Sequence, residues 1–257
     1  MTARFIALTR AVSPRLAECE LTHLSREPIH LGTAHAQHHQ YEELLTRLGC
    51  EVRRVAPAPE LPDSVFIEDT AIVFDDVAII TRPGALSRRA EIAAVERALT
   101  PLRPLVRIVS PGVLDGGDVF HVGRRVFVGL TSRTNEAGIM QLRADLAPFG
   151  YSVQQVAVTG CLHLKSAVTA INDATVLVNP AWVDVRTFEP LECVAVHPEE
   201  PAAANVLRIG DVLVYSDAYP RTLARLRELG HQVHTVPATE IAKAEGAVTC
   251  CSLVLRA

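Results

Sequence analysis

The stretch DVFHVGRRVFVG (118–129) contains two short apolar runs on either side of the pair Gly123-Arg124. These residue types tolerate the backbone conformation of a two-residue turn, so the stretch predicts two antiparallel strands joined as a hairpin. The next segment, MQLRADLAPFGYSVQQVAV (140–158), has the apolar spacing of a helix, then a glycine and a third strand. The repeating unit is therefore two paired strands, a helix and one more strand.

This unit recurs along the chain. Hairpin-like strand pairs are found again at 69–81, 166–179 and 205–216. Helix-and-strand segments are found again at 41–57, 91–111 and 222–238, and in reduced form at 188–198. Gly49, Gly150 and Gly230 are predicted to end three of the helices, because glycine adopts the left-handed conformation at little cost.

The fifth unit places its inner strand in AVTCCSLVLRA (247–257), and its missing partner is predicted to be the opening strand RFIALTR (4–10). Pairing of the two ends closes a ring and protects both strand edges. We therefore predict a single α/β domain over 1–257, folded as a five-bladed pseudo-symmetric ββαβ propeller. The alternative is a doubly wound α/β sheet, but G-x-G-x-x-G is absent and turn-linked strand pairs suit antiparallel neighbours.

The composition excludes several classes of partner. A net charge of −4, without a Lys/Arg-rich run, gives no basic surface for nucleic acid. No stretch approaches the roughly 20 continuous apolar residues of a membrane span. The N-terminal apolar patch is too short for a secretion signal, so we predict a cytoplasmic protein with reduced thiols. The six cysteines form no C-x-x-C pair, which argues against a zinc knuckle or a thioredoxin-type redox pair.

Polar residues mark the starts of the predicted inner strands, which surround the axis of such a ring. They are Glu68-Asp69, Asp115-Gly116-Gly117-Asp118, His163 and Thr249-Cys250. An acidic pair is costly to bury unless a cation meets it, and a solvated strand end explains the pair equally well. The Gly116-Gly117 step marks either a close backbone approach or a plain turn.

Three of these residues form a possible catalytic set. A lone histidine in an apolar segment is usually a core residue, but His163 becomes a base if Asp115 orients it and a thiol is near. Cys250 is the candidate thiol, because a small-residue loop enters the last strand there. Strand side chains alternate, so Cys251 is expected to face the other way.

At these residues the sequence resembles the dimethylarginine dimethylaminohydrolase family. The resemblance runs essentially from end to end and is carried by PDSVFIEDTAIV (62–73), ITRPGALSRRAE (80–91), LDGGDVF (114–120), SRTNEAG (132–138), LHLKSAV (162–168), YPRT (219–222) and EGAVTCCSL (245–253). It implies the five-bladed propeller of the guanidine-modifying (pentein) superfamily. It also implies hydrolysis of methylated arginine to citrulline, without a metal or organic cofactor.

The resemblance also assigns roles to single positions. Cys250 matches the family's nucleophile, His163 its general acid/base and Asp115, a glutamate in some relatives, the acid that orients the histidine. Substrate contacts are implied for Asp63, Glu68 and Asp69 (amine and guanidinium), Arg88 and Arg133 (α-carboxylate), and Leu21 and Ala244 (main chain). Surface ion pairing is the plain alternative for both arginines. Leu21 lies in the loop 10–30, which is either a lid over the site or a mobile surface loop.

We therefore predict a dimethylargininase that acts on a small-molecule substrate through a covalent Cys250 thiouronium. The runner-up is an arginine deiminase-like enzyme acting on another guanidine, although such enzymes are usually longer. A non-catalytic propeller would need neither the Cys–His–Asp set nor buried acids, and a cysteine peptidase would not need an acidic pocket. The sequence leaves open whether the protein is a monomer or a homodimer.

Overall fold

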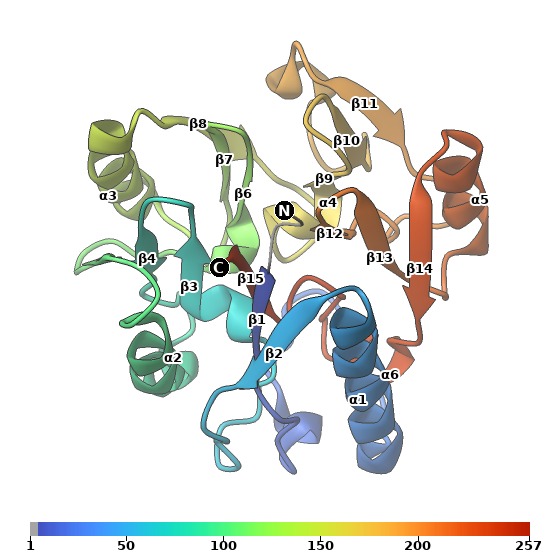
Figure 1. Cartoon of the computed structure of the whole chain (residues 1–257), viewed down its shortest axis with the longest axis horizontal. Coiled ribbons are helices and arrows are strands. Elements are labelled where there is room, and N and C mark those ends of the chain that lie inside the picture. The colour runs from blue at the N-terminus through green and yellow to red at the C-terminus, as the bar shows by residue number, and fades with distance from the viewer. Residues whose placement is uncertain (1–4) are drawn as a thin grey trace.

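The computed structural model describes residues 5–257, which form five three-stranded sheets arranged around a common centre (Figure 1). The sheets are β3 (Ala71–Val73), β4 (Ala78–Ile80) and β5 (Leu105–Arg107); β6 (Val119–Val122), β7 (Arg125–Leu130) and β8 (Ser152–Ala157); β9 (Val168–Ala170), β10 (Thr175–Val178) and β11 (Glu192–Ala195); β12 (Leu207–Ile209), β13 (Val212–Ser216) and β14 (Gln232–Val236); and β15 (Leu253–Arg256), β1 (Phe5–Thr9) and β2 (Cys50–Arg54).

Every sheet has the same internal order. The inner strand pairs antiparallel with the middle strand, and the middle strand pairs parallel with the outer one, as β6, β7 and β8 do. The larger helices lie at the periphery in Figure 1: α1 (Leu31–Arg47), α2 (Ile92–Leu99), α3 (Glu136–Leu146) and α5 (Pro220–Glu228). The reduced unit has only the 3-10 turn η6 (Val185–Phe188) in the equivalent place. The predicted five-bladed ββαβ propeller is therefore confirmed.

The ring closes where the two ends of the chain meet. β1 pairs antiparallel with β15, from Phe5 opposite Arg256 to Leu8 opposite Leu253, and pairs parallel with β2. This confirms the predicted pairing of the opening and closing strands, although residue 4 of the predicted strand lies outside the described residues. The predicted turn glycine Gly123 has a φ value of 55°, and Gly210, in the turn of the predicted strand pair 205–216, has a φ value of 60°, as a tight hairpin turn requires.

Short helical segments precede the inner strands and lead the chain into the ring's centre. They are η2 (Ile67–Thr70), η4 (Gly116–Asp118) and α4 (Leu164–Ala167), while a turn at 247–251 precedes β15. The remaining short segments are η1 (Leu16–Glu18), η3 (Leu86–Glu91), η5 (Ala147–Phe149) and α6 (Thr239–Ala242). Side chains on these inner segments therefore converge, although they come from different sheets.

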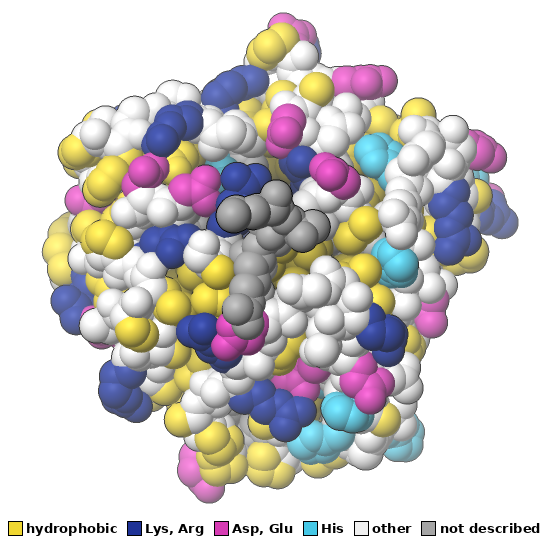
Figure 2. All heavy atoms as spheres, viewed as in Figure 1, with side chains coloured by type: hydrophobic (Ala, Val, Ile, Leu, Met, Phe, Trp, Pro, Cys, Tyr) yellow, Lys and Arg dark blue, Asp and Glu magenta, His cyan; other side chains and the backbone are white. Residues whose placement is uncertain are grey.

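The face of the molecule drawn in Figure 2 has no large region of like-charged side chains. Basic and acidic side chains are interspersed there with apolar ones. None of the helices within residues 5–257 is long and apolar enough to cross a membrane.

Candidate active site

Seven of the ten predicted site residues line one small pocket near the ring's centre. They are Asp63, Asp69, Arg88, Arg133, His163, Ala244 and Cys250. An eighth, Asp115, is fully buried directly behind His163. The structure thus brings together side chains that lie up to 187 residues apart in the chain, from Asp63 to Cys250.

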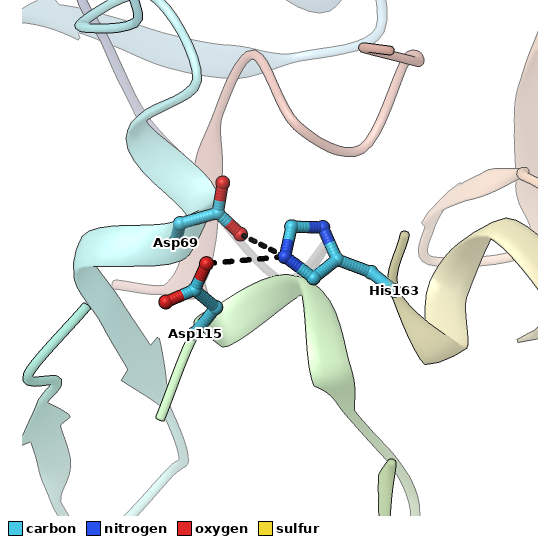
Figure 3. Close-up of side chains that lie close together, drawn as sticks. All are labelled: Asp69, Asp115 and His163. Atoms are coloured by element: carbon cyan, nitrogen blue, oxygen red, sulfur yellow. Dashed lines mark hydrogen bonds and ion pairs between the residues drawn. The ribbon is translucent and has the colours of Figure 1, made fainter. Parts of the chain in front are cut away.

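His163 stands at the N-terminus of α4, where two carboxylates face one of its ring nitrogens (Figure 3). Its Nε2 lies 3.1 Å from Asp115 Oδ2 and 3.9 Å from Asp69 Oδ1. The sequence left open whether Gly116-Gly117 is a close backbone approach or a plain turn. A Cβ added at Gly117 would lie 2.7 Å from His163 Nδ1. Gly116-Gly117 is therefore a close backbone approach, which lets the imidazole lie directly against the chain.

The acidic surroundings keep this imidazole charged. Burial disfavours the imidazolium, but Asp69, the hydrogen bond to Asp115, and Asp118 outweigh it and raise the pKa of His163 to about 9. Burial likewise opposes the charge of Asp69, yet His163 and Arg88 lower its pKa to about 2. At neutral pH the pair is therefore an imidazolium beside a carboxylate, and the histidine holds a proton that it can donate.

The two neighbouring cysteines have different surroundings. Cys250 lines the pocket, whereas Cys251 is buried in an apolar cluster with Tyr41 and Leu45. Both precede β15 in the turn at 247–251, so turn geometry rather than strand alternation separates them. Burial and the charges of Glu68 and Asp69 raise the pKa of the Cys250 thiol well above its usual range. The protein alone therefore favours the thiol, and a cation beside it would favour the thiolate.

Arg88 and Arg133 are both buried, so neither is the surface ion-pair residue that the sequence left as an alternative. Arg88 is 4% exposed; it donates to Glu91, to Asp69 and to the carbonyl oxygens of Asp63 and Phe66. Arg133 has fewer partners, since its Nη2 donates to Thr22 Oγ1 at 3.3 Å and its Nη1 lies 4.0 Å from Asp115. Arg133 therefore has more N–H groups free for an anion.

The side chain of Glu68, which the family resemblance assigns to substrate contact, does not line the Cys250 pocket. Its carboxylate accepts hydrogen bonds from Lys165 Nζ at 2.6 Å and Thr249 Oγ1 at 2.8 Å, and it lines a different cavity on the ring axis. The structure therefore does not bring the Glu68 side chain to the wall of the Cys250 pocket. The cation that a buried acidic pair requires is present on each side, as Lys165 for Glu68 and Arg88 for Asp69.

The segment 20–24 lies at the pocket mouth. The Glu20 N–H donates to Asp63, whose pKa burial raises to about 6. The N–H groups of Thr22, His23 and Leu24 converge on the carboxylate of Glu245, at 3.0, 2.5 and 2.6 Å. Glu245 has a φ of 57°, a left-handed conformation that is unusual for a residue with a side chain. Leu21 is not at the pocket wall; it packs against the apolar cluster of α1.

One group of residues could offer ligands to a metal ion. Among the described residues, only Asp69, Asp115 and His163 place three ligand atoms within 4.8 Å of one another. Their carboxylate oxygens already have partners, because Gly117 N–H and Arg88 donate to Asp69, while Gly84 N–H and His163 face Asp115. The donor set is therefore satisfied by the chain's own groups.

The sequence analysis assigned no role to four residues of this region: Glu20, Asp118, Lys165 and Glu245. Asp118, Lys165 and Glu245 stand in the quoted motifs LDGGDVF, LHLKSAV and EGAVTCCSL, so only their tertiary contacts were beyond reach. Glu20 lies in an irregular segment, where no periodic pattern marks a paired side chain.

Comparison with known proteins supplies close relatives, although no family model matches. The chain is 47% identical, over 251 residues, to an N(G),N(G)-dimethylarginine dimethylaminohydrolase of Streptomyces coelicolor. The alignment covers 97% of this chain and 96% of that enzyme. It is 33% identical over 219 residues, with 84% and 86% of the two chains covered, to an enzyme of that name from Pseudomonas aeruginosa.

Solved structures agree with this relationship. A Cys-to-Ser variant of the Pseudomonas aeruginosa enzyme in complex with citrulline has a TM-score of 0.91 and 29% identity, covering 99% of this chain and 100% of that one. The N-terminal domain of a cyanobacterial arginine dihydrolase shares the fold alone, with a TM-score of 0.86, 17% identity and coverage of 98% and 97%. The chain belongs to the dimethylarginine dimethylaminohydrolase family.

Proposed function

We propose that this protein hydrolyses Nω-methylated L-arginine to L-citrulline and dimethylamine or methylamine, with Cys250, His163 and Asp115 as its catalytic groups. The observation that carries the proposal is one pocket lined by a thiol and by an imidazole that a buried carboxylate holds at 3.1 Å. These are the nucleophile, acid/base and orienting group of a cysteine hydrolase.

Substrate recognition is assigned to the charged groups at the pocket. The Asp69 carboxylate, held between Arg88 and the Gly117 N–H, faces the position where a guanidinium would meet Cys250. Arg133, together with the remaining N–H of Arg88, suits an α-carboxylate, and Asp63 suits an α-ammonium group. Glu68 contributes from behind the pocket, through its charge and through Thr249, rather than by contact with the substrate.

The reaction follows from these charges. Bound cationic substrate lowers the pKa of the Cys250 thiol, which releases its proton to solvent, and the thiolate attacks the guanidinium carbon to give a tetrahedral adduct. The imidazolium of His163 donates its proton to the departing dimethylamine, which leaves a thiouronium on Cys250. Neutral His163 then takes a proton from water, the oxygen adds to the same carbon, and the thiolate leaves as citrulline forms. One water is consumed for each amine released.

The direct test is incubation with asymmetric dimethylarginine, with citrulline and dimethylamine measured together. Equal amounts of the two products are expected. Faster release of ammonia from unmethylated arginine would instead favour the arginine deiminase-like alternative. Conversion of neither compound would overturn the proposal.

Other properties remain predictions. We expect a single domain that needs no metal or organic cofactor, so activity should survive dialysis against a chelator. A cytoplasmic location is also expected, and sedimentation would decide between a monomer and a homodimer.

A further inference from the structure

Asp118 is a fully buried carboxylate that the proposed reaction does not use. It is the last residue of η4 and lies three residues after Asp115. Its Oδ1 accepts the Leu164 N–H at 2.9 Å, and its Oδ2 accepts the hydroxyls of Thr131 at 2.7 Å and Thr134 at 2.6 Å. All three partners are donors, and they come from two other segments of the chain.

Each of these donors is tied to a residue of the proposed site. Leu164 directly follows His163, and its N–H is a free donor at the start of α4, so Asp118 fixes the backbone from which the imidazole extends. The Thr134 hydroxyl also accepts the Asp115 N–H at 3.2 Å. The Thr131 hydroxyl likewise accepts the Arg133 N–H at 3.0 Å.

The surrounding chain is shaped around this carboxylate. A Cβ added at Gly129 of β7 would lie 2.9 Å from Asp118 Oδ1 and 3.0 Å from the Leu164 side chain. Only glycine therefore lets β7 approach so closely. An ionised carboxylate accepts hydrogen bonds and donates none, whereas an amide in its place would turn an N–H group toward one of these donors.

We infer that Asp118 is a positioning residue, whose one carboxylate holds the backbones of His163, Asp115 and Arg133 in the arrangement that the reaction needs. The inference rests on the proposed function. Asp118 acts through hydrogen bonds to the backbone and to threonines, and it does not touch the substrate. It also adds a negative charge near the imidazole.

The negative charge of Asp118 affects the pKa of His163, which a purely structural role would leave unchanged. Burial raises the pKa of Asp118 to about 6, opposed by His163 and the two threonine hydroxyls, so the group is ionised at neutral pH. His163 is surrounded by the carboxylates of Asp69, Asp115 and Asp118, with Arg88 bound to Asp69, Arg133 near Asp115 and Cys250 on the pocket wall. Loss of one of the three negative charges destabilises the imidazolium and lowers its pKa.

The first test is Asp118→Asn, compared with wild type on asymmetric dimethylarginine. We expect kcat to fall about 100-fold, as misplacement of catalytic groups typically produces, while KM changes less than about threefold. The NMR titration midpoint of His163 should move to lower pH. An unchanged kcat per folded molecule, or an unshifted midpoint, would overturn the inference.

A matched pair at Thr134 keeps the test decisive if Asp118→Asn does not fold. Thr134→Val removes the hydroxyl that links Asp118 to the Asp115 N–H, and Thr134→Ser keeps it. We expect a loss of kcat of about tenfold for the valine variant and less than about twofold for the serine variant, a difference typical of one lost charged hydrogen bond. Equal activities of the two would contradict the inference. Inactive wild type would instead overturn the proposed function.

Discussion

The two ends of the ring axis are built from the same five strands but differ in character. At one end the inner strands begin, and η2, η4, α4 and the turn at 247–251 bring acids, an imidazole and a thiol to a small pocket. Further along the same strands lies a wider cavity, whose charges include the ion pair of exposed Asp173 with half-buried Arg208. Chemistry is therefore concentrated where the repeat departs from regular strand geometry.

Between the two cavities lies a thin polar layer. Glu68, Lys165 and Thr249 line the wider cavity, and Cys250, adjacent to Thr249 in the chain, lines the pocket. Asn205 completes the layer, because its side chain both donates to and accepts from Thr249. The comparison teaches that a small hydrogen-bonded network, built on the Glu68–Lys165 ion pair, separates the Cys250 pocket from the wider cavity.

The largest expected effect is on the pocket side. Cys250→Ser replaces the nucleophile with a poorly ionised hydroxyl, so turnover of dimethylarginine should fall more than about 1,000-fold. Binding should persist, and isothermal calorimetry on the variant measures it. Near-normal turnover would show that the thiol facing this pocket is not the nucleophile.

A second experiment uses the charge of the pocket. Because burial, Glu68 and Asp69 raise the pKa of Cys250, an uncharged alkylating reagent should label it slowly at pH 7 and faster as the pH rises. A cationic alkylating amidine should label it at pH 7 at least about 100 times faster, since its charge favours the thiolate. Mass spectrometry of the peptide measures both rates. Equal rates, or no protection by substrate, would contradict the model of a cation-activated thiol.

Removing the Glu68–Lys165 ion pair from the polar layer should lower both the stability of the protein and its kcat. Lys165→Met leaves the buried Glu68 carboxylate without its cation, which should cost about 3 kcal/mol of folding free energy. Thr249 shares that carboxylate and precedes Cys250, so kcat should also fall, by about tenfold. Urea unfolding and steady-state kinetics measure the two losses. Adding Glu68→Gln should restore most of the stability; a single variant as stable as wild type would contradict this account.

The openings of the Cys250 pocket and of the wider cavity also differ. Segment 20–24 lies at the opening of the pocket, where its N–H groups donate to the Glu245 carboxylate. Glu245→Gln replaces a charged acceptor of three N–H groups with a weaker one. We expect KM to rise about fivefold with little change in kcat, consistent with about 1 kcal/mol of lost hydrogen bonding. Glu199→Gln, an exposed ion-pair residue, is the control. Equal KM values for the two variants would mean that the contact of Glu245 with segment 20–24 does not affect binding.

The smallest effect is expected at the neighbouring thiol. Cys251→Ser changes a buried side chain that contacts the core and not the pocket, and its hydroxyl can donate to the Ala247 carbonyl oxygen as the thiol does. Activity should stay within about threefold of wild type, with at most about 1 kcal/mol of lost stability. Loss of turnover here, with Cys250→Ser active, would reverse the assignment of the two thiols.

Local patterns were enough to predict the blades and the pairing of the terminal strands. Each hairpin has its own turn residues and each helix its own apolar spacing, so five similar signals reinforced one another. The convergence of Cys250, His163 and Asp115 followed from the same repeat. The ion pair of Glu68 with Lys165 could not be predicted, since it joins residues 97 positions apart and no periodicity links them. The roles of Asp118 and Glu245 depend likewise on backbone donors that only the folded chain brings together.

The meeting of β1 with β15 has a consequence for the order of events in the cell. The strand Phe5–Thr9 leaves the ribosome before the other strands of the ring, but its antiparallel neighbour Leu253–Arg256 is made some 240 residues later. During that interval β1 has only β2 beside it. Cys250 lies just before β15, so a nascent chain that stalls before residue 250 would lack both the β1–β15 pairing and the proposed nucleophile.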